Sequence, residues 1–226
     1  MADRMLVFDI DGVLVDVTES YRETIRQTVE HFSGKRVSRE VIQQYKNEGG
    51  WNNDWELSHH LIAKNGAVVE LQDVIDHFNR LFFGADHDGL LYRERWIARP
   101  GLLERLFETW EFALFTGRIQ EELRVTLERF AARLRFDPIM SAEVLEQQKP
   151  SPEGLLRIAR LKPGKSLWYI GDTVDDARAA RAARVPFIGI ASPASPRRGE
   201  LAGLFKAENA VAVLDDINQL ETVLPQ

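Results

Sequence analysis

The chain has no cysteine among its 226 residues, which excludes a disulfide framework and a thiol nucleophile. Its apolar runs are short, and none approaches the roughly 18 residues that a membrane-spanning helix needs. It also lacks a basic excess, because 29 Lys and Arg stand against 35 Asp and Glu, for a formal net charge of −6. The overall field therefore gives no help to non-specific nucleic-acid binding, and the arginines form no basic block.

The first apolar run begins at Met5, which leaves no room for a signal peptide. We therefore expect a cytoplasmic protein with neither a nucleic-acid nor a membrane partner. Apolar residues make up 44% of the chain, enough for a sizeable core in one large domain or in a domain with an insertion. The sequence leaves the oligomeric state open.

The most informative stretch is the apolar run 5–8, which Asp9 and Asp11 follow with one residue between them. A short continuous apolar run predicts a buried strand, and Gly12 allows a sharp turn after it. Ligands of parallel sheets bind beyond the carboxyl ends of the strands, so both carboxylates should face a binding crevice. Two such charges are costly unless a cation joins them or one keeps a proton, and oxygen ligands suit Mg²⁺. The alternative is a strand with an Asp-rich turn.

The rest of the chain changes character twice. From 16 to 98 the apolar residues follow helical spacing, which predicts a small helical bundle, with Thr18 or Ser20 capping its first helix. From Pro100 onward, strands alternate with helices, which predicts a parallel sheet. We therefore predict an α/β fold, a Rossmann-like doubly wound core formed by 1–15 and 99–226. The inserted unit 16–98 leaves the chain beside the paired Asp residues, the natural position for a lid.

Three further places lie just after predicted strands or at helix starts, and each suits a phosphate. Thr116 offers a hydroxyl, Gly117 allows close backbone approach, and N–H groups at a helix start can meet an anion. Lys149 lies in a segment that two prolines stiffen. Asp172, Asp175 and Asp176 follow the last central strand. Taken singly, these features also fit a helix cap, a solvated lysine and acids that favour a helix dipole.

In this order, the segments together resemble the motifs of the haloacid dehalogenase superfamily of phosphohydrolases. Asp9-Ile10-Asp11-Gly12-Val13-Leu14 matches the first motif and Phe115-Thr116-Gly117-Arg118 the second. Lys149-Pro150 matches the third motif, and Gly171-Asp172-Thr173-Val174-Asp175-Asp176 the fourth. The α/β part is covered, whereas the insertion resembles the family's helical cap only in position and character. The resemblance implies a central sheet with strand order 5-4-1-2-3.

The resemblance also implies a phosphatase mechanism. Asp9 would attack phosphorus and form an aspartyl-phosphate, while Asp11 would protonate the leaving group and then activate water. Mg²⁺ would bridge Asp9 and the phosphate, with the main-chain carbonyl of Asp11 and the carboxylate of Asp172 as further ligands.

The remaining motif residues have supporting roles in the same comparison. Asp176 would hold either a metal-bound water or Lys149, and the role of Asp175 is open. Thr116 and the Gly117 N–H would bind phosphoryl oxygens, and Lys149 would offset the negative charge. The substrate would be a small phosphorylated metabolite. Its identity should depend mainly on the cap, where the loop Gly49 to Trp55 is the candidate specificity element.

Other activities of the superfamily compete with this one. Dehalogenases lack a carboxylate at the position of Asp11, so dehalogenation is disfavoured. Phosphonatases need a cap lysine, but Lys35, Lys46 and Lys64 are the only lysines of the insertion and none aligns with that role. Some phosphomutases place a histidine where Tyr21 stands, which lowers that alternative without excluding it. A phosphate-binding module without turnover is the competing class, but binding alone does not require Asp11.

Overall fold

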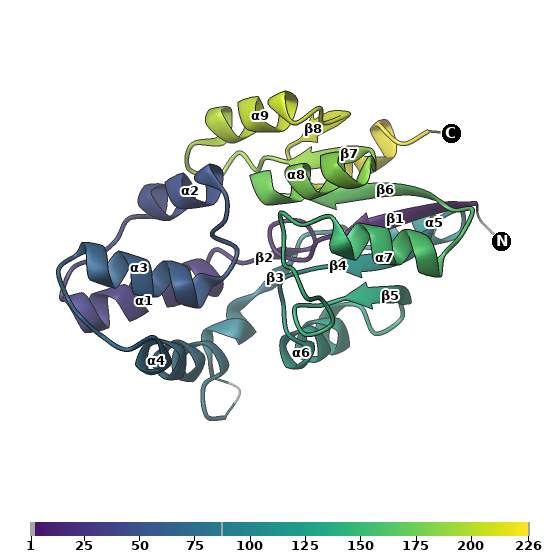
Figure 1. Ribbon diagram of the computed structural model, residues 1–226. Coiled ribbons are helices and arrows are strands. Elements are labelled where there is room, and N and C mark those ends of the chain that lie inside the picture. Colours follow the sequence, from purple (N-terminus) through teal and green to yellow (C-terminus); the bar gives the residue numbers. More distant parts are fainter. Residues whose placement is uncertain (1–2, 87, 226) are drawn as a thin grey trace. The chain divides into compact units, whose positions relative to one another are not determined.

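The computed structural model describes residues 3–86 and 88–225 and divides into two compact units. The core unit combines Met1–Val15 with Trp96–Gln226, and the helical unit is Asp16–Arg95. Figure 1 shows the elements of both. The chain passes between the units through two short paired strands, β2 (Val15–Asp16) and β3 (Arg95–Trp96), which the helical periodicity of this region did not predict. Because of β3, the core unit resumes at Trp96, slightly earlier than residue 99.

Within the described residues, a six-stranded parallel sheet runs through the core unit in the order β5-β4-β1-β6-β7-β8. Its strands are β1 (Arg4–Phe8), β4 (Glu111–Phe115), β5 (Phe136–Met140), β6 (Ser166–Gly171), β7 (Phe187–Ile190) and β8 (Ala212–Leu214). The predicted α/β class is confirmed. Counted along the core, the first five strands have the order 5-4-1-2-3, and β8 extends the sheet as a sixth strand beside β7.

Strand β1 forms the centre of the sheet because both of its faces are apolar. Met5 and Val7 point to one face, Leu6 and Phe8 belong to the other, and all four are fully buried. Such burial on both sides is typical of a parallel sheet covered by helices. The neighbours β4 and β6 pair with β1 in parallel, so the residues that follow these three strands emerge at one edge. Pro138 is accommodated in β5 because that strand lies at the edge of the sheet.

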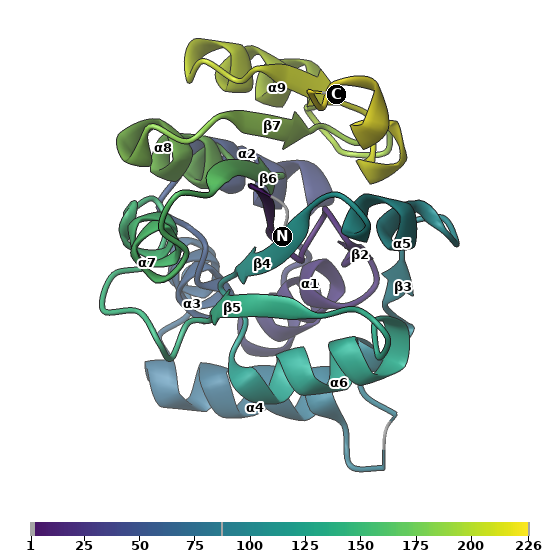
Figure 2. The same ribbon diagram turned by 90° about the vertical axis from the view of Figure 1, so that its right-hand side faces the viewer.

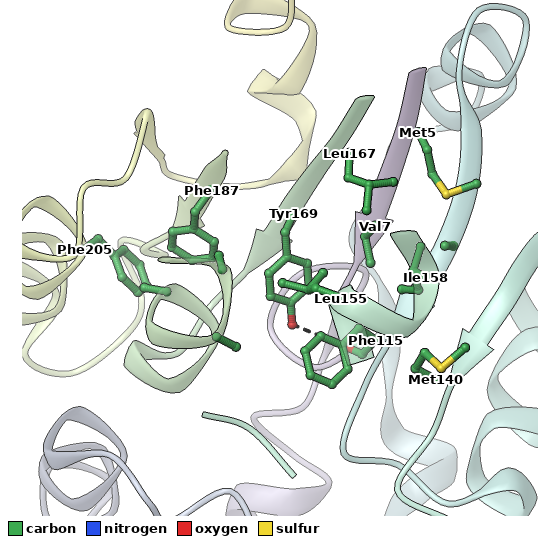
Figure 3. Packing of buried hydrophobic residues seen from close by; sticks show 14 of the residues in the cluster. Met5, Val7, Phe115, Met140, Leu155, Ile158, Leu167, Tyr169, Phe187 and Phe205 are labelled. Atoms are coloured by element: carbon green, nitrogen blue, oxygen red, sulfur yellow. Dashed lines mark hydrogen bonds between the residues drawn. The ribbon is translucent and has the colours of Figure 1, made fainter. Parts of the chain in front are cut away.

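One face of the sheet carries a cluster of buried hydrophobic residues, which Figure 3 shows. The rings of Phe205, Phe187, Tyr169 and Phe115 follow one another with centroids 5.4–6.0 Å apart. Three helices cover this face: α7 (Glu153–Leu161), α8 (Val174–Ala183) and α9 (Arg198–Ala207). Helix α5 (Leu102–Phe107) lies on the opposite face, where the ring of Phe107 contacts that of Phe112 in β4. Figure 2 shows α5 and α7 on opposite sides of the sheet.

The remaining core helices are α6 (Gln120–Phe130) and the 3₁₀ helix η2 (Ile217–Thr222). Asp216 occupies the N-cap position of η2, and its carboxylate accepts from the Asn218 N–H. No helix of the described chain is long and apolar enough to cross a membrane.

The helical unit consists of α1 (Tyr21–Ser33), α2 (Arg39–Glu48), α3 (Asp54–Lys64), α4 (Leu71–Phe83) and the 3₁₀ helix η1 (Leu90–Arg93). Helix α1 packs against α3 and α4, and the ring centroids of Tyr21 and Phe82 are 4.4 Å apart. The predicted cap of α1 is wrong in detail. Ser20 occupies the N-cap position, but its hydroxyl donates to Glu94 Oε1 at 3.1 Å and caps no N–H.

Candidate active site

Asp9 follows β1 directly and is almost completely buried, with 5% of its surface exposed. Its Oδ1 accepts from the Ile10 N–H at 2.8 Å, and its Oδ2 lies 3.0 Å from Lys149 Nζ. Burial raises the pKa of the Asp9 carboxyl to about 7, although Lys149 acts in the opposite direction. A buried carboxylate in this position gains from any further positive charge that comes close to it.

Lys149 is held between two acids rather than solvated. Its Nζ donates to Asp176 Oδ1 at 2.7 Å and lies over the rings of Phe115 and Tyr169 at 5.1 and 5.8 Å. Burial alone would lower the pKa of Lys149, but the carboxylates of Asp176 and Asp9 outweigh it and raise that pKa. The ammonium therefore stays charged, and it brings its charge to the side of Asp9.

Asp176 anchors this lysine from the first turn of α8. Besides Lys149, its Oδ1 accepts from the Tyr169 hydroxyl at 2.5 Å. Its Oδ2 accepts from the Thr173 N–H and hydroxyl at 2.9 and 2.7 Å, and from the Asp172 N–H at 3.2 Å. Burial would raise the pKa of Asp176, but Lys149 and these hydrogen bonds lower it. The sequence left two roles open for Asp176, holding a metal-bound water or holding Lys149. In the structure, Asp176 contacts Lys149.

Asp172 completes an oxygen-rich group. One carboxylate oxygen from each of Asp9, Asp172 and Asp176 lies within 4.8 Å of the others, an arrangement that could hold a cation. Gly12 makes room for this group, because a Cβ there would lie 1.9 Å from Asp172 Oδ2 and its φ is +70°. Asp175 lies apart from these acids and is buried on α8, 3.6 Å from Arg178.

Asp11 turns to a different partner. Arg118 donates to Asp11 Oδ1 from Nε at 2.9 Å and from Nη2 at 2.5 Å. The Asp11 side chain is 30% exposed, whereas that of Arg118 is completely buried. The carboxyl of Asp11 therefore stands outside the oxygen-rich group but keeps access to solvent.

The turn after β4 holds the two predicted phosphate-binding residues. Thr116 is fully buried, and its hydroxyl oxygen accepts from the Arg118 N–H at 3.2 Å. Gly117 is exposed and has open space where a Cβ would be, so a ligand could approach the backbone there. The start of α6 is less available, because Glu122 and Glu143 accept from the N–H groups of Ile119 and Gln120. These two N–H groups are not open to an anion.

Sequence reasoning missed two side chains of the site. Tyr169 belongs to an apolar strand, where its hydroxyl gave no signal, and Arg118 was quoted within a motif without a role. The hint for Arg118 was a charged residue directly after a buried strand, followed by a helix. Its buried environment becomes visible only when β1 and β4 are paired.

Comparisons with known proteins show the family of the chain. The family model of the haloacid dehalogenase-like hydrolases matches residues 6–190. The chain belongs to this family. The predicted superfamily is thereby confirmed, and the family model describes a hydrolase, the general class of enzyme that the sequence predicted.

Two curated relatives are similar to this chain over most of its length. The chain is 32% identical over 201 residues to an imidazoleglycerol-phosphate dehydratase of Phytophthora nicotianae, covering 83% of this chain and 43% of that protein. It thus spans less than half the length of this relative. It is 24% identical over 195 residues to a phosphoglycolate phosphatase of Pseudomonas fluorescens, covering 83% of this chain and 69% of that protein.

Solved structures show the same fold. A putative haloacid dehalogenase-like hydrolase from Bacteroides fragilis has a TM-score of 0.73 at 20% identity, covering 96% of this chain and 98% of that one. A putative β-phosphoglucomutase from Thermotoga maritima has a TM-score of 0.67 at 20% identity, covering 98% and 100%. At these identities the likeness extends to the fold alone.

Proposed function

We propose that the protein is a Mg²⁺-dependent phosphatase that hydrolyses a small phosphorylated metabolite through an aspartyl-phosphate on Asp9. One observation carries the proposal: a buried carboxylate at the end of the central strand shares a lysine with Asp176 and lies beside Asp172. A structural ion pair needs no third carboxylate at this edge. A nucleophile that must approach a phosphate dianion needs positive charge near it.

The chain's own residues account for both chemical steps. In the first, an Asp9 oxygen attacks phosphorus, the bond to the leaving oxygen breaks, and Asp11 gives that oxygen a proton. In the second, water attacks the phosphorus, Asp11 takes its proton, and inorganic phosphate leaves Asp9. Lys149 balances charge on Asp9 and the phosphoryl group in both steps, and Thr116 with the Gly117 N–H would hold phosphoryl oxygens.

The donor set fits a hard divalent cation, because the group consists of carboxylate oxygens only. Asp9 and Asp172 would hold Mg²⁺, together with the main-chain carbonyl of Asp11. Asp176 already accepts five hydrogen bonds, so its main contribution is to anchor Lys149. The ion would reduce the repulsion between Asp9 and the phosphate when both are bound.

The relatives named phosphoglycolate phosphatase make phosphoglycolate the first candidate substrate to test. Tyr21 supports a phosphatase over a phosphomutase, because its ring packs against Phe78 and Phe82 within the helical unit. The helical unit is proposed as the cap, since the chain leaves and re-enters the core unit next to the end of β1.

The proposal is tested by following phosphate release from p-nitrophenyl phosphate and from a panel of phosphoglycolate, glycerol phosphate and hexose phosphates. Activity should vanish when EDTA removes divalent ions and return with Mg²⁺. Asp172→Ala should raise the Mg²⁺ concentration needed for half-maximal activity. Full activity in metal-free buffer would contradict the proposed dependence on Mg²⁺. If no member of the panel is hydrolysed in the presence of Mg²⁺, the proposed phosphatase activity is contradicted.

A further inference from the structure

A buried arginine contacts the proposed proton-transfer residue. Arg118 emerges from the turn after β4, and Asp11 lies just beyond the neighbouring strand β1. The three guanidinium nitrogens have acceptors: Nε and Nη2 donate to Asp11 Oδ1, and Nη1 donates to Thr126 Oγ1 of α6 at 2.5 Å. Burying an arginine completely is costly, so its partners must compensate for the lost hydration.

The backbone of this turn is fixed on both sides of the arginine. The Arg118 N–H donates to Thr116 Oγ1 at 3.2 Å, and the Arg118 carbonyl accepts from the Ala142 N–H at 3.0 Å. The planar guanidinium therefore meets Asp11 from a defined position and direction. This is a stronger constraint than a flexible surface lysine or arginine could supply.

We propose that Arg118 is a positioning residue, which fixes the orientation of the Asp11 carboxyl for proton transfer. The inference rests on the proposed function, in which Asp11 protonates the leaving oxygen. Both bonds from Arg118 go to Oδ1, so the rotation of the carboxyl is restrained and Oδ2 is the oxygen that exchanges the proton. The exposure of Asp11, 30% against none for Arg118, places its carboxyl where a leaving group can reach it.

Two other roles for Arg118 fit the contacts less well. Direct binding of phosphate would require the completely buried guanidinium to give up Asp11 or Thr126. A purely structural ion pair would not need its carboxylate to remain partly open to solvent. The three roles predict different effects of an Arg118 variant on substrates with different leaving groups. Only loss of Asp11 function should selectively slow substrates whose leaving group needs a proton, because Asp11 donates that proton.

The test compares kcat/KM for p-nitrophenyl phosphate with kcat/KM for the alkyl phosphate that the wild-type protein hydrolyses fastest in the panel. This ratio reports the first step, up to release of the leaving group. p-Nitrophenolate leaves without a proton, whereas an alkoxide needs one. Arg118→Gln should lower kcat/KM for the alkyl phosphate about ten-fold or more beyond its effect on p-nitrophenyl phosphate, as Asp11→Asn should.

A double variant and a matched control complete the design. Adding Arg118→Gln to Asp11→Asn should change kcat/KM by no more than about two-fold, because the arginine acts through the missing carboxylate. Arg105→Gln is the control, since Arg105 also makes two bonds to one carboxylate, that of Glu221 on the surface. It should leave the ratio between the two substrates unchanged.

Equal losses on both substrates in Arg118→Gln would overturn the inference and leave a structural or phosphate-binding arginine. If Arg118→Gln does not fold, as judged by thermal unfolding, Arg118→Lys keeps the charge without the planar fork and should show the same selective loss. If neither folds, Thr126→Val removes one acceptor of Nη1 and keeps Arg118, so the guanidinium loses part of its support and a smaller selective loss should follow. An unchanged substrate ratio in that variant overturns the inference.

Failure of the inference and failure of the proposed function have different signatures. A wild-type protein that hydrolyses neither substrate would contradict the phosphatase itself. A wild-type protein that is active, with a selective loss in Asp11→Asn and none in the folded Arg118 variants, would contradict the role of Arg118 alone.

Discussion

The two units of this protein use buried polar residues in different ways. In the core unit, charged side chains from separate strand ends converge on one another, and Asp176 accepts hydrogen bonds from Lys149, Tyr169 and Thr173. In the helical unit, the buried Lys46 pairs with Asp54 and the Trp51 carbonyl of its own loop. The first arrangement collects charge at the edge of the sheet where we propose the active site, and the second holds a loop in place.

The difference shows why one unit is informative about chemistry and the other is not. A network assembled from distant segments fixes reactive groups relative to one another, which is what catalysis requires. A local network stabilises a loop whatever that loop later contacts. On the proposed function, the core unit performs the chemistry while the helical unit selects the substrate, and variants in the two units should therefore behave differently.

The largest effect is expected from removing the shared lysine. Lys149→Ala leaves the buried carboxylates of Asp9 and Asp176 without their cation, which should cost about 3–5 kcal/mol of unfolding free energy. Activity should fall about a hundred-fold or more on every substrate, because the charge acts on the phosphoryl group itself. Urea unfolding and phosphate release measure the two effects.

Lys162→Ala is the matched control, since Lys162 pairs with the half-exposed Asp137 far from the strand ends that carry the site. It should cost about 0–1 kcal/mol and leave activity unchanged. Equal behaviour of the two lysine variants would mean that the core network is structural only.

A change in the helical unit should alter selectivity instead. The Trp51 ring packs against Tyr45 and His60, at centroid distances of 5.4 and 4.6 Å. If the loop faces the leaving group, Trp51→Ala should change the relative kcat/KM of panel substrates by about ten-fold. Hydrolysis of p-nitrophenyl phosphate should change much less. If Trp51→Ala leaves the ranking of the panel substrates by kcat/KM unchanged, the proposed role of the helical unit as a lid is contradicted.

Asn53 needs separate treatment in this experiment. Its side chain caps α3 and accepts from the N–H groups of Trp55 and Glu56, at 3.0 and 3.2 Å. Asn53→Ala should therefore cost about 1 kcal/mol of stability whatever the loop contacts. Asn53→Asp retains the cap and is the better variant for testing selectivity.

A smaller effect is expected from the tyrosine that supports Asp176. Tyr169→Phe removes the hydroxyl that donates to Asp176 Oδ1 but leaves Lys149 and Thr173 in contact with it. We expect a loss of about 1.5–3 kcal/mol in unfolding free energy and a drop in kcat of a few-fold. The drop should be equal for aryl and alkyl phosphates. A selective loss on alkyl phosphates would mean that Tyr169 affects Asp11.

The smallest effect concerns the helical unit and pH. The rings of His31 and His77 are stacked with centroids 3.9 Å apart, and burial, His31 and Arg80 lower the pKa of His77. A histidine whose pKa is lowered in the folded state binds its proton more readily when unfolded. Stability should therefore decline as pH falls through about 6.5, the value for an unfolded chain. Thermal unfolding of wild type and His77→Gln between about pH 8 and pH 5 measures this.

His77→Gln should weaken the decline, and activity at neutral pH should be unchanged, because neither histidine belongs to the core network. An identical pH dependence in the variant would show that His77 does not contribute.

The sequence predicted the core unit well because its signals are local. An apolar run followed by acids identifies both a buried strand and its carboxyl end, so Asp9, Asp11 and Asp172 could be placed after their strands from the sequence. Contacts across strands were less accessible. The pairing of Arg118 with Asp11 depends on the register of β1 and β4, and no spacing along the chain encodes it.

Caps and short strands were the other weak point. Ser20 stands where a capping residue is expected, but its hydroxyl donates a hydrogen bond to Glu94, which is distant in sequence. Strands β2 and β3 are too short to produce an alternating pattern. In each case a contact with a residue distant in sequence determines the local structure, and the local sequence alone does not indicate that contact.

The central claim is that Asp9 becomes phosphorylated, and the most direct test is to trap that intermediate. Wild-type protein is mixed with p-nitrophenyl phosphate and Mg²⁺, quenched in acid during turnover, digested, and analysed by mass spectrometry. We predict a covalent phosphate on the peptide that contains Asp9. The folded Asp9→Asn variant should show no phosphate there and no turnover. A phosphate on another residue, or normal turnover by Asp9→Asn, would contradict the account.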